Sequence, residues 1–383
     1  MLLSWKKHLG LSCLLFAGLS FAQNNVNAGA VIFNTGSSAT ATIALGINDE
    51  GHLNFSTGGG GGEEEGGGEE FGFEELVGPP FSVNNSSRVG VAYNFPAEGF
   101  YDATSPGCFC EGWGVSATHV DTSTAYSGYA NVSSDSGANN LTVDSFLTDA
   151  DGLLETGTFA TSSVHVTDLA GFKVSQAYTA STNAPGALFQ DTVTITNDTG
   201  STLNDVRYVR VMDWDVPHTE FSEFVTIVGT GTTSLLEESD NNGFNSANPL
   251  APLFSYGMND VDFVDVGPSD HGAYFRFNFG SLADGEEYTF SIFYGAAANE
   301  TAAIAAVIAE GIELFSFGQS NSGSGAANSA PTFIFGFKGV GGAVLEEDDI
   351  PVNPTVPEPS SMALMLLGMV GLGEAARRRR NRK

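Results

Sequence analysis

The amino-acid sequence predicts an all-β fold, a large antiparallel β-sandwich-like domain with one short helix. Between residues 89 and 338, short runs rich in β-branched and aromatic residues are separated by Gly, Asn, Asp and Pro. Phe outnumbers Trp by 29 to 3, and aromatic side chains at alternate strand positions suit the core between two packed sheets. No repeat of about 40 residues is present, which favours a sandwich over a propeller.

The charge of the chain is strongly acidic and unevenly distributed. The 383 residues include 14 Lys and Arg against 45 Asp and Glu, a formal net charge of −31. Eight of the basic residues lie at the two ends, so the segment 23–356 holds six basic and 43 acidic residues, a formal charge of −37. Nucleic acids are bound through Lys and Arg contacts to phosphates, so this composition excludes a nucleic-acid partner.

The N-terminal residues 1–22 predict a secretory signal peptide. A basic head, Met1–His8, precedes an apolar run, Leu9–Ala22, that ends on the small-x-small pattern Ser20-Phe21-Ala22. The alternative is a buried N-terminal helix. Cys13 lies within the apolar run and is expected to be removed with it.

Two early strands open the β domain within residues 23–57. Val31–Phe33 and Ala41–Ile47 are apolar, and turn-forming residues 35–38 separate them. Residues 58–75 contain the tract GGGGGEEEGGGEE, in which glycine entropy and like charges predict a disordered loop.

The β-sandwich domain is predicted to span residues 76–340. Its clearest hairpin joins Thr192–Thr196 to Val206–Trp214 through a turn at residues 197–200. The return strand is apolar on both faces, which predicts a central strand covered on both sides. A further strand, 273–279, places three Phe on one face, and the strand 288–294 follows the turn Asp284-Gly285.

One helix is predicted, with Asn299 as its N-cap and Gly311 as its stop. A loop at 319–330 and a last strand at 331–338 close the domain. Residues 341–355 are acidic and contain prolines, so they predict a stalk between the domain and the C-terminal segment.

The C-terminal segment 356–383 has three parts in a fixed order. Pro357, Glu358 and Pro359 precede an apolar stretch, and Arg377–Arg380 lead a basic tail. Counted from residue 360 to 376, the stretch would be roughly 26 Å long as a helix, the short limit for a transmembrane span. The alternative is a plain C-terminal membrane anchor.

This order resembles the PEP-CTERM sorting signal of Gram-negative bacteria, and Pro357, Glu358 and Pro359 match its motif. The resemblance implies recognition by exosortase, a membrane-embedded cysteine transpeptidase. It also implies cleavage near the motif, transient anchoring in the inner membrane through the C-terminal helix, and delivery to the cell surface or exopolysaccharide matrix.

Cys108 and Cys110 lie in a Gly- and Pro-rich loop. An exported chain meets an oxidising compartment, so the pair predicts a local disulfide, although the spacing makes a small and strained ring. Free or intermolecular thiols are the first alternative. A redox role or a metal site is the other, with His119 as the only further metal ligand nearby.

Asp213, Trp214 and Asp215 end the predicted hairpin, and Glu220 and Glu223 follow. Carboxylates beside a Trp are the components of a glycosidase site. The alternative is a strand end with solvated acids. The chain has no Gly-x-Ser-x-Gly, His-Glu-x-x-His or phosphate-binding motif, so we expect no enzyme. A carbohydrate-binding module built on Trp113 and Trp214 is a third interpretation.

Calcium is the only cofactor that the sequence suggests. Two groups of acidic residues lie at loop-like positions and offer oxygen ligands. They are Asp149, Asp151 and Glu155 in the first group, and Asp260 and Asp262 in the second. The alternative for both is turn formation, in which Asp caps its own backbone.

The sequence therefore predicts an exported cell-surface or exopolysaccharide-matrix protein with a non-catalytic structural or adhesive role. The expected partners are exosortase, exopolysaccharide and, before processing, the membrane. The alternative is a secreted carbohydrate-active enzyme or carbohydrate-binding protein.

Overall fold

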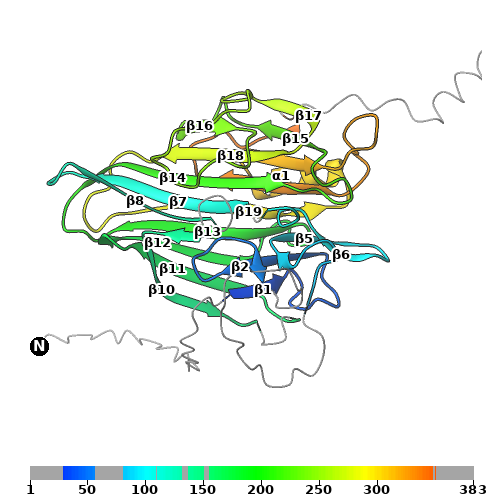
Figure 1. Ribbon diagram of the computed structural model, residues 1–383, viewed down its shortest axis with the longest axis horizontal. Coiled ribbons are helices and arrows are strands. Elements are labelled where there is room, and N and C mark those ends of the chain that lie inside the picture. Colours follow the sequence, from blue (N-terminus) through cyan, green and yellow to red (C-terminus); the bar gives the residue numbers. More distant parts are fainter. Residues whose placement is uncertain are drawn as a thin grey trace, which may run out of the picture.

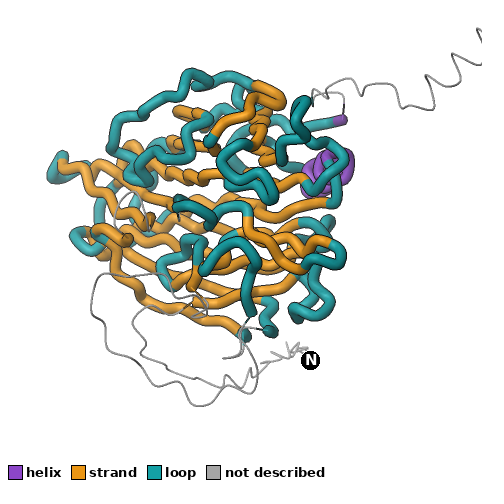
Figure 2. Tube along the Cα trace, turned by 45° about the vertical axis from the view of Figure 1, so that its right-hand side comes forward, coloured by secondary structure: helices purple, strands orange, loops and turns teal. Residues whose placement is uncertain are grey.

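The computed structural model describes residues 29–56, 81–108, 110–131, 137–150, 155–347 and 350. These residues form three large antiparallel sheets, one two-stranded sheet and one α-helix (Figure 1). Figure 2 shows how small the helical share is. The predicted all-β, sandwich-like fold is confirmed.

The largest sheet has nine strands. In spatial order these are β10 (Leu141–Thr148), β11 (Phe159–Val166), β12 (Leu169–Ala180), β13 (Leu188–Asn197), β19 (Glu287–Ala297), β21 (Thr332–Lys338), β20 (Leu314–Gln319), β15 (Glu223–Val228) and β17 (Phe263–Ser269).

The second sheet has six strands, β16 (Leu236–Asp240), β18 (His271–Asn278), β14 (Leu203–Trp214), β7 (Glu111–His119), β8 (Thr124–Asn131) and β9 (Gly137–Asn139). The third has four, β1 (Gly29–Phe33), β2 (Ile43–Asn48), β5 (Val91–Phe95) and β6 (Gly99–Asp102). The two-stranded sheet pairs β3 (Phe55–Ser56) with β4 (Arg88–Val89). The predicted early strands correspond to β1 and β2.

One face of the nine-stranded sheet packs against both smaller sheets. Tyr208 of β14 contacts Phe290 of β19 with ring centroids 5.1 Å apart, which joins the nine- and six-stranded sheets. Tyr93 of β5 lies 6.5 Å from Phe333 of β21, which joins the nine- and four-stranded sheets. Buried apolar residues of all three sheets share one continuous core. The aromatic side chains thus fill a sandwich interior, as their alternation predicted.

The helix α1 (Glu300–Glu310) covers part of the opposite face of the nine-stranded sheet. The Asn299 side chain accepts a hydrogen bond from the Ala302 backbone N–H (2.9 Å). Gly311 ends the helix in the left-handed conformation, with φ of 66°, which glycine adopts without a Cβ clash. The predicted helix and both of its end signals are confirmed.

The predicted hairpin at residues 192–214 is wrong. β13 pairs with β12 and β19 in the nine-stranded sheet, whereas β14 pairs with β7 and β18 in the six-stranded sheet. Residues 198–202 therefore form an arch that crosses the sandwich. The connection between β18 and β19 is a second arch, and Leu203 and Leu282 exchange backbone hydrogen bonds of 2.8 and 2.9 Å between the two.

β14 is a central strand, as its apolar residues on both faces predicted. Tyr208 and Met212 face the sandwich core. Val209 and Val211 face outward and are buried in a cluster with Ala247 of the loop between β16 and β17. This loop closes the outer face of the six-stranded sheet over β14.

Several predicted segments lie outside the described residues. These are the signal peptide (1–22), the Gly/Glu-rich loop (58–75) and the sorting segment (356–383). Of the predicted stalk (341–355), residues 341–347 and 350 are described, and Leu345 and Ile350 are buried in the cluster around α1. Among the described residues, no helix has the length and apolarity to cross a membrane.

Candidate functional site

Three carboxylates meet where β14 ends. Asp213 is the penultimate residue of β14, and Asp215 follows the strand. Asp270 precedes β18, the strand paired with β14, in which Gly272 lies opposite Asp213. One oxygen of each of the three side chains lies within 4.8 Å of the other two. The pairing of β14 with β18 thus brings Asp270 to two acids that lie 55 or more residues before it in the chain.

The group is closed on one side and open on the other. Asp213 and Asp215 are each 1% exposed, whereas Asp270 is exposed to solvent. The loop after β16 closely covers the buried side, since a Cβ on Gly243 would lie 2.8 Å from Asp213 Oδ1. Solvent therefore reaches the carboxylates from the Asp270 side.

The backbone positions the two buried acids, but their side chains lack partners. The Asp213 N–H donates to Cys110 O (2.9 Å), and the Asp215 N–H donates to Ala103 O (2.8 Å). Among the described residues, neither oxygen of Asp215 has a hydrogen-bond partner, and neither does Asp213 Oδ1. A buried charge is normally paired, so this arrangement is incomplete within the described protein.

Glu223 adds a fourth buried carboxyl beside this group. Its Oε1 accepts a hydrogen bond from the His271 N–H (3.0 Å), and its Oε2 has no partner among the described residues. Burial raises the pKa of Glu223 to about 8. Burial, reinforced by the charges of Asp213 and Glu223, raises the pKa of Asp215 to about 10.

No positive side chain pairs with these four carboxyl groups within the part of the chain that the structure describes. The ion pairs found there do not involve Asp213, Asp215, Asp270 or Glu223. Burial lowers the pKa of His271 to about 4, so its imidazole is neutral at pH 7.

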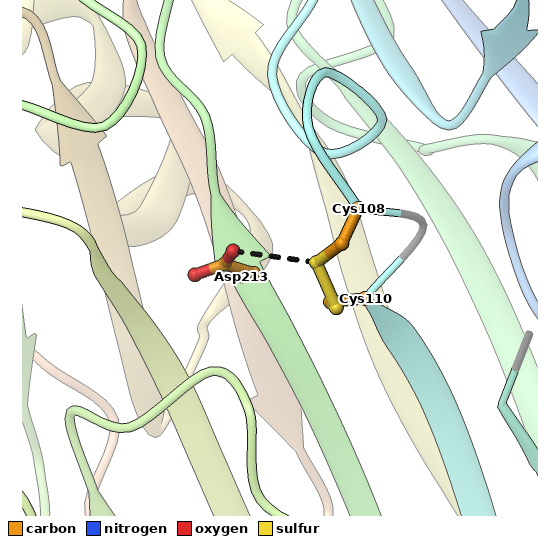
Figure 3. A group of neighbouring side chains, drawn as sticks. All are labelled: Cys108, Cys110 and Asp213. Carbon is orange, nitrogen blue, oxygen red and sulfur yellow. Dashed lines mark hydrogen bonds between the residues drawn. A yellow bond between two sulfur atoms is a disulfide. The ribbon is translucent and has the colours of Figure 1, made fainter. Parts of the chain in front are cut away.

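The cysteine pair borders this acidic group. Cys108 and Cys110 are joined by a disulfide, and Cys108 Sγ lies 3.7 Å from Asp213 Oδ2 (Figure 3). Disulfide sulfurs are not thiolates, so they do not supply the ligands of a zinc site. His119 ends β7, about 26 Å along the strand from the residue after Cys110, so it cannot join them.

The residues proposed for sugar chemistry do not form one open site. Trp214 and Trp113 are fully buried, and their indole N–H groups donate to Ser316 Oγ (3.0 Å) and Glu50 O (2.9 Å). Neither ring can stack on a sugar, so a carbohydrate platform built on them is wrong. Glu220 accepts from Asn85 Nδ2 (2.9 Å) and is not part of the group formed by Asp213, Asp215 and Asp270.

The predicted calcium groups have other contacts. Asp149 Oδ1 accepts from the backbone N–H groups of Thr158 (2.7 Å) and Phe159 (3.0 Å). Asp151 lies outside the described residues, and Glu155 is described and exposed.

In the second predicted group, Asp260 Oδ1 accepts from the Ser239 N–H (2.8 Å). Asp262 Oδ1 accepts from the N–H groups of Gly229 (3.1 Å) and Thr230 (2.8 Å). Asp149, Asp260 and Asp262 thus accept from backbone amides that lie 9 to 33 residues away in the chain, rather than capping the backbone of their own turns.

A second candidate surface lies on the outer side of the nine-stranded sheet. Two rows of uncharged side chains cross β11, β12, β13 and β19, in register with one another. Together with a neighbouring serine of β10, they form what we name the hydroxyl face, Ser145, Thr161, Ser163, Ser175, Thr192, Thr194, Thr289 and Ser291. Six of these residues line a shallow depression of about 310 Å³.

Four hydroxyls of this face bond to one another in two pairs, and those of Thr192 and Ser291 accept from Gln190 Nε2 (3.4 and 2.9 Å). Thr194 and Thr289 share a hydrogen bond of 3.0 Å across β13 and β19, and Ser175 Oγ donates to Ser163 Oγ (3.3 Å). Adjacent strands lie about 4.8 Å apart, so the hydroxyls of Ser163, Ser175, Thr194 and Thr289 recur at about that interval, whereas Ala177 interrupts the other row. The flanking row is charged and includes Lys173, which pairs with Asp198.

The comparisons with known proteins bear on the C-terminal segment. Residues 355–380 match the family model of the PEP-CTERM protein-sorting motif, which confirms the resemblance at Pro357, Glu358 and Pro359. No curated protein and no solved structure matches the chain. The chain therefore carries a PEP-CTERM protein-sorting motif, and it is an exported protein that is sorted by exosortase.

Proposed function

We propose that this protein is a non-catalytic component of the cell surface or exopolysaccharide matrix, where it adheres to polysaccharide through the hydroxyl face. The observation that carries the proposal is the pair of uncharged rows across four adjacent strands, in which every side chain except Ala177 is Ser or Thr. They form a broad neutral surface on a protein whose segment 23–356 has a formal charge of −37.

The chemistry of this face suits a polymer of sugars. Each hydroxyl both donates and accepts hydrogen bonds, as do the hydroxyls of a polysaccharide. A hydrogen bond that replaces one to water contributes only about 0.5–1.5 kcal/mol, so affinity depends on many simultaneous contacts. A flat face offers such contacts to a long chain, and repeated binding along the polymer adds avidity.

The buried acids support a non-catalytic role. A glycosidase needs two carboxyl groups that flank a bound sugar. Asp213 and Asp215 are each 1% exposed, so a sugar ring cannot enter between them without movement of the loop that contains Gly243.

Co-sedimentation of the exported protein with exopolysaccharide from its producing cells tests the proposal. Thr194→Asp introduces a charge at the centre of the hydroxyl face, and we expect the bound fraction to fall at least fivefold. Ser324→Asp adds the same charge on the exposed loop before β21 and serves as the matched control. Equal binding by the two variants would contradict the proposal.

A further inference from the structure

We propose that Asp213, Asp215 and Asp270 form a binding site for a divalent cation of the calcium type. The site lies between the end of β14 and the turn before β18. It involves neither the hydroxyl face nor the two acidic groups that the sequence suggested for calcium.

The spacing of the oxygens fits one ion. Calcium binds carboxylate oxygens at about 2.3–2.6 Å, so ligands on opposite sides of the ion are about 4.6–5.2 Å apart and others are closer. One oxygen each of Asp213, Asp215 and Asp270 lies within 4.8 Å of the other two. A single ion can therefore contact all three side chains without rearrangement of the strands.

The state of Asp215 is an independent indication of a missing ligand. Its side chain is almost fully buried, and both of its oxygens lack a hydrogen-bond partner among the described residues. By contrast, two other buried carboxylates, Asp102 and Glu111, have partners on both oxygens. Asp102 accepts from the N–H groups of Gly90 (2.7 Å) and Thr104 (2.8 Å), and Glu111 pairs with Arg210. A bound cation would give Asp215 the counter-charge that Glu111 obtains from Arg210.

The site is accessible and suited to a hard cation. Asp270 is exposed, so an ion can enter from its side while water supplies the remaining ligands. The strongly acidic protein attracts cations and raises their local concentration. Carboxylate oxygens favour calcium over softer metals, and the disulfide leaves Cys108 without a thiolate to offer.

Calcium titration of the exported protein, after dialysis against EDTA, tests the proposal by isothermal titration calorimetry and thermal unfolding. We expect one ion per chain at this site and a higher melting temperature in calcium. Asp215→Asn keeps the size of the side chain and removes its charge, so it should lower the affinity at least tenfold and reduce the rise in melting temperature at the same calcium concentration.

Two further variants make the test decisive. Asp270→Asn changes an exposed side chain, so the variant should fold normally. It should also weaken calcium binding about tenfold. If Asp215→Asn does not fold, Asp270→Asn by itself tests the cation site. Asp262→Asn is the matched control, since its carboxylate accepts from backbone amides, and it should bind within twofold of the unaltered protein. Absence of calcium binding, or unchanged affinity in Asp270→Asn, would overturn the proposal.

Discussion

The Arg210 side chain connects all three large sheets, and its removal should destabilise the fold strongly. Arg210 of β14 pairs with Glu111 of β7, and both are fully buried. Arg210 Nη1 also donates to Gln176 Oε1 (2.9 Å) in the nine-stranded sheet and to Gly51 O (3.3 Å) beyond β2. Glu111 Oε2 accepts from the Leu53 N–H (2.7 Å). The pair thus fixes the four-stranded sheet to the other two.

Arg210→Met would leave the Glu111 carboxylate buried without its counter-charge. Loss of one partner of a buried ion pair typically costs about 3–5 kcal/mol of unfolding free energy. Arg210→Met also loses the hydrogen bonds to Gln176 and Gly51, so we expect its cost to lie in the upper part of that range. Glu111→Gln leaves the guanidinium of Arg210 without its counter-charge. Its cost in unfolding free energy should lie in the lower part of the same range, since the amide oxygen can still accept a hydrogen bond from Arg210. The double variant should cost less than the sum, because neither charge is then left alone.

Urea unfolding, followed by the fluorescence of the buried Trp113, measures these free energies. Lys173→Met is the control, because the Lys173–Asp198 pair is solvent-exposed and such pairs contribute about 0–1 kcal/mol. The reasoning is refuted if Arg210→Met costs no more than Lys173→Met, or if the two single variants are additive in the double variant.

Three further predictions concern other parts of the chain. Burial lowers the pKa of His52 from 6.5 to about 3, so below pH 6.5 the unfolded state binds a proton that the folded state does not bind. The midpoint of urea unfolding should therefore fall to lower urea concentrations as the pH drops from 6.5 towards 3. His52→Asn should reduce this dependence on pH. Asn299→Ala removes the acceptor for the Ala302 N–H and should cost about 1 kcal/mol in urea unfolding, whereas Asn299→Ser should cost much less. Deletion of residues 357–359 should retain the protein in the inner-membrane fraction, and unchanged surface delivery would contradict the role of the motif.

The features that the sequence predicted correctly depend on local signals. Asn299 and Gly311 mark the ends of α1 through contacts within a few residues. The two apolar faces of β14 likewise identify a covered strand without knowledge of its neighbours. Each signal lies within one segment of the chain, so it can be recognised in the sequence alone.

The choice between a hairpin and an arch is not a local property. Asn197 Oδ1 accepts from the Thr199 N–H (3.1 Å), a turn contact that residues 197–200 can form in either connection. What selects the arch is the pairing of β13 with β19 and of β14 with β18, each from a later part of the chain. The sequence therefore predicted the turn but assigned its strands to one sheet.

The acidic group at the end of β14 was only half predictable for the same reason. Asp213 and Asp215 stand out as neighbours in the sequence, but Asp270 joins them only through the pairing of β14 with β18. Local clustering instead pointed to Asp149, Asp260 and Asp262, whose carboxylates accept from backbone amides. Acidic residues that are close in the sequence are common in turns, so their clustering is weak evidence for a cation site. Buried carboxylates without a hydrogen-bond partner are stronger evidence, but they are recognised only in the structure.

A cation at Asp213, Asp215 and Asp270 would also couple the stability of the fold to its location. The three residues come together only in the folded chain, so the ion binds the folded state and stabilises it by mass action. At a calcium concentration 100 times the dissociation constant, this stabilisation is about 2.7 kcal/mol. Calcium is scarce in the cytoplasm and more abundant outside the cell, so an exported chain would gain this increment after translocation. The folded domain would therefore be less stable before export, when translocation requires an unfolded chain, than afterwards. The dependence of melting temperature on calcium should then be weaker in Asp270→Asn while the hydroxyl face still binds polysaccharide, because the two sites lie on different sheets.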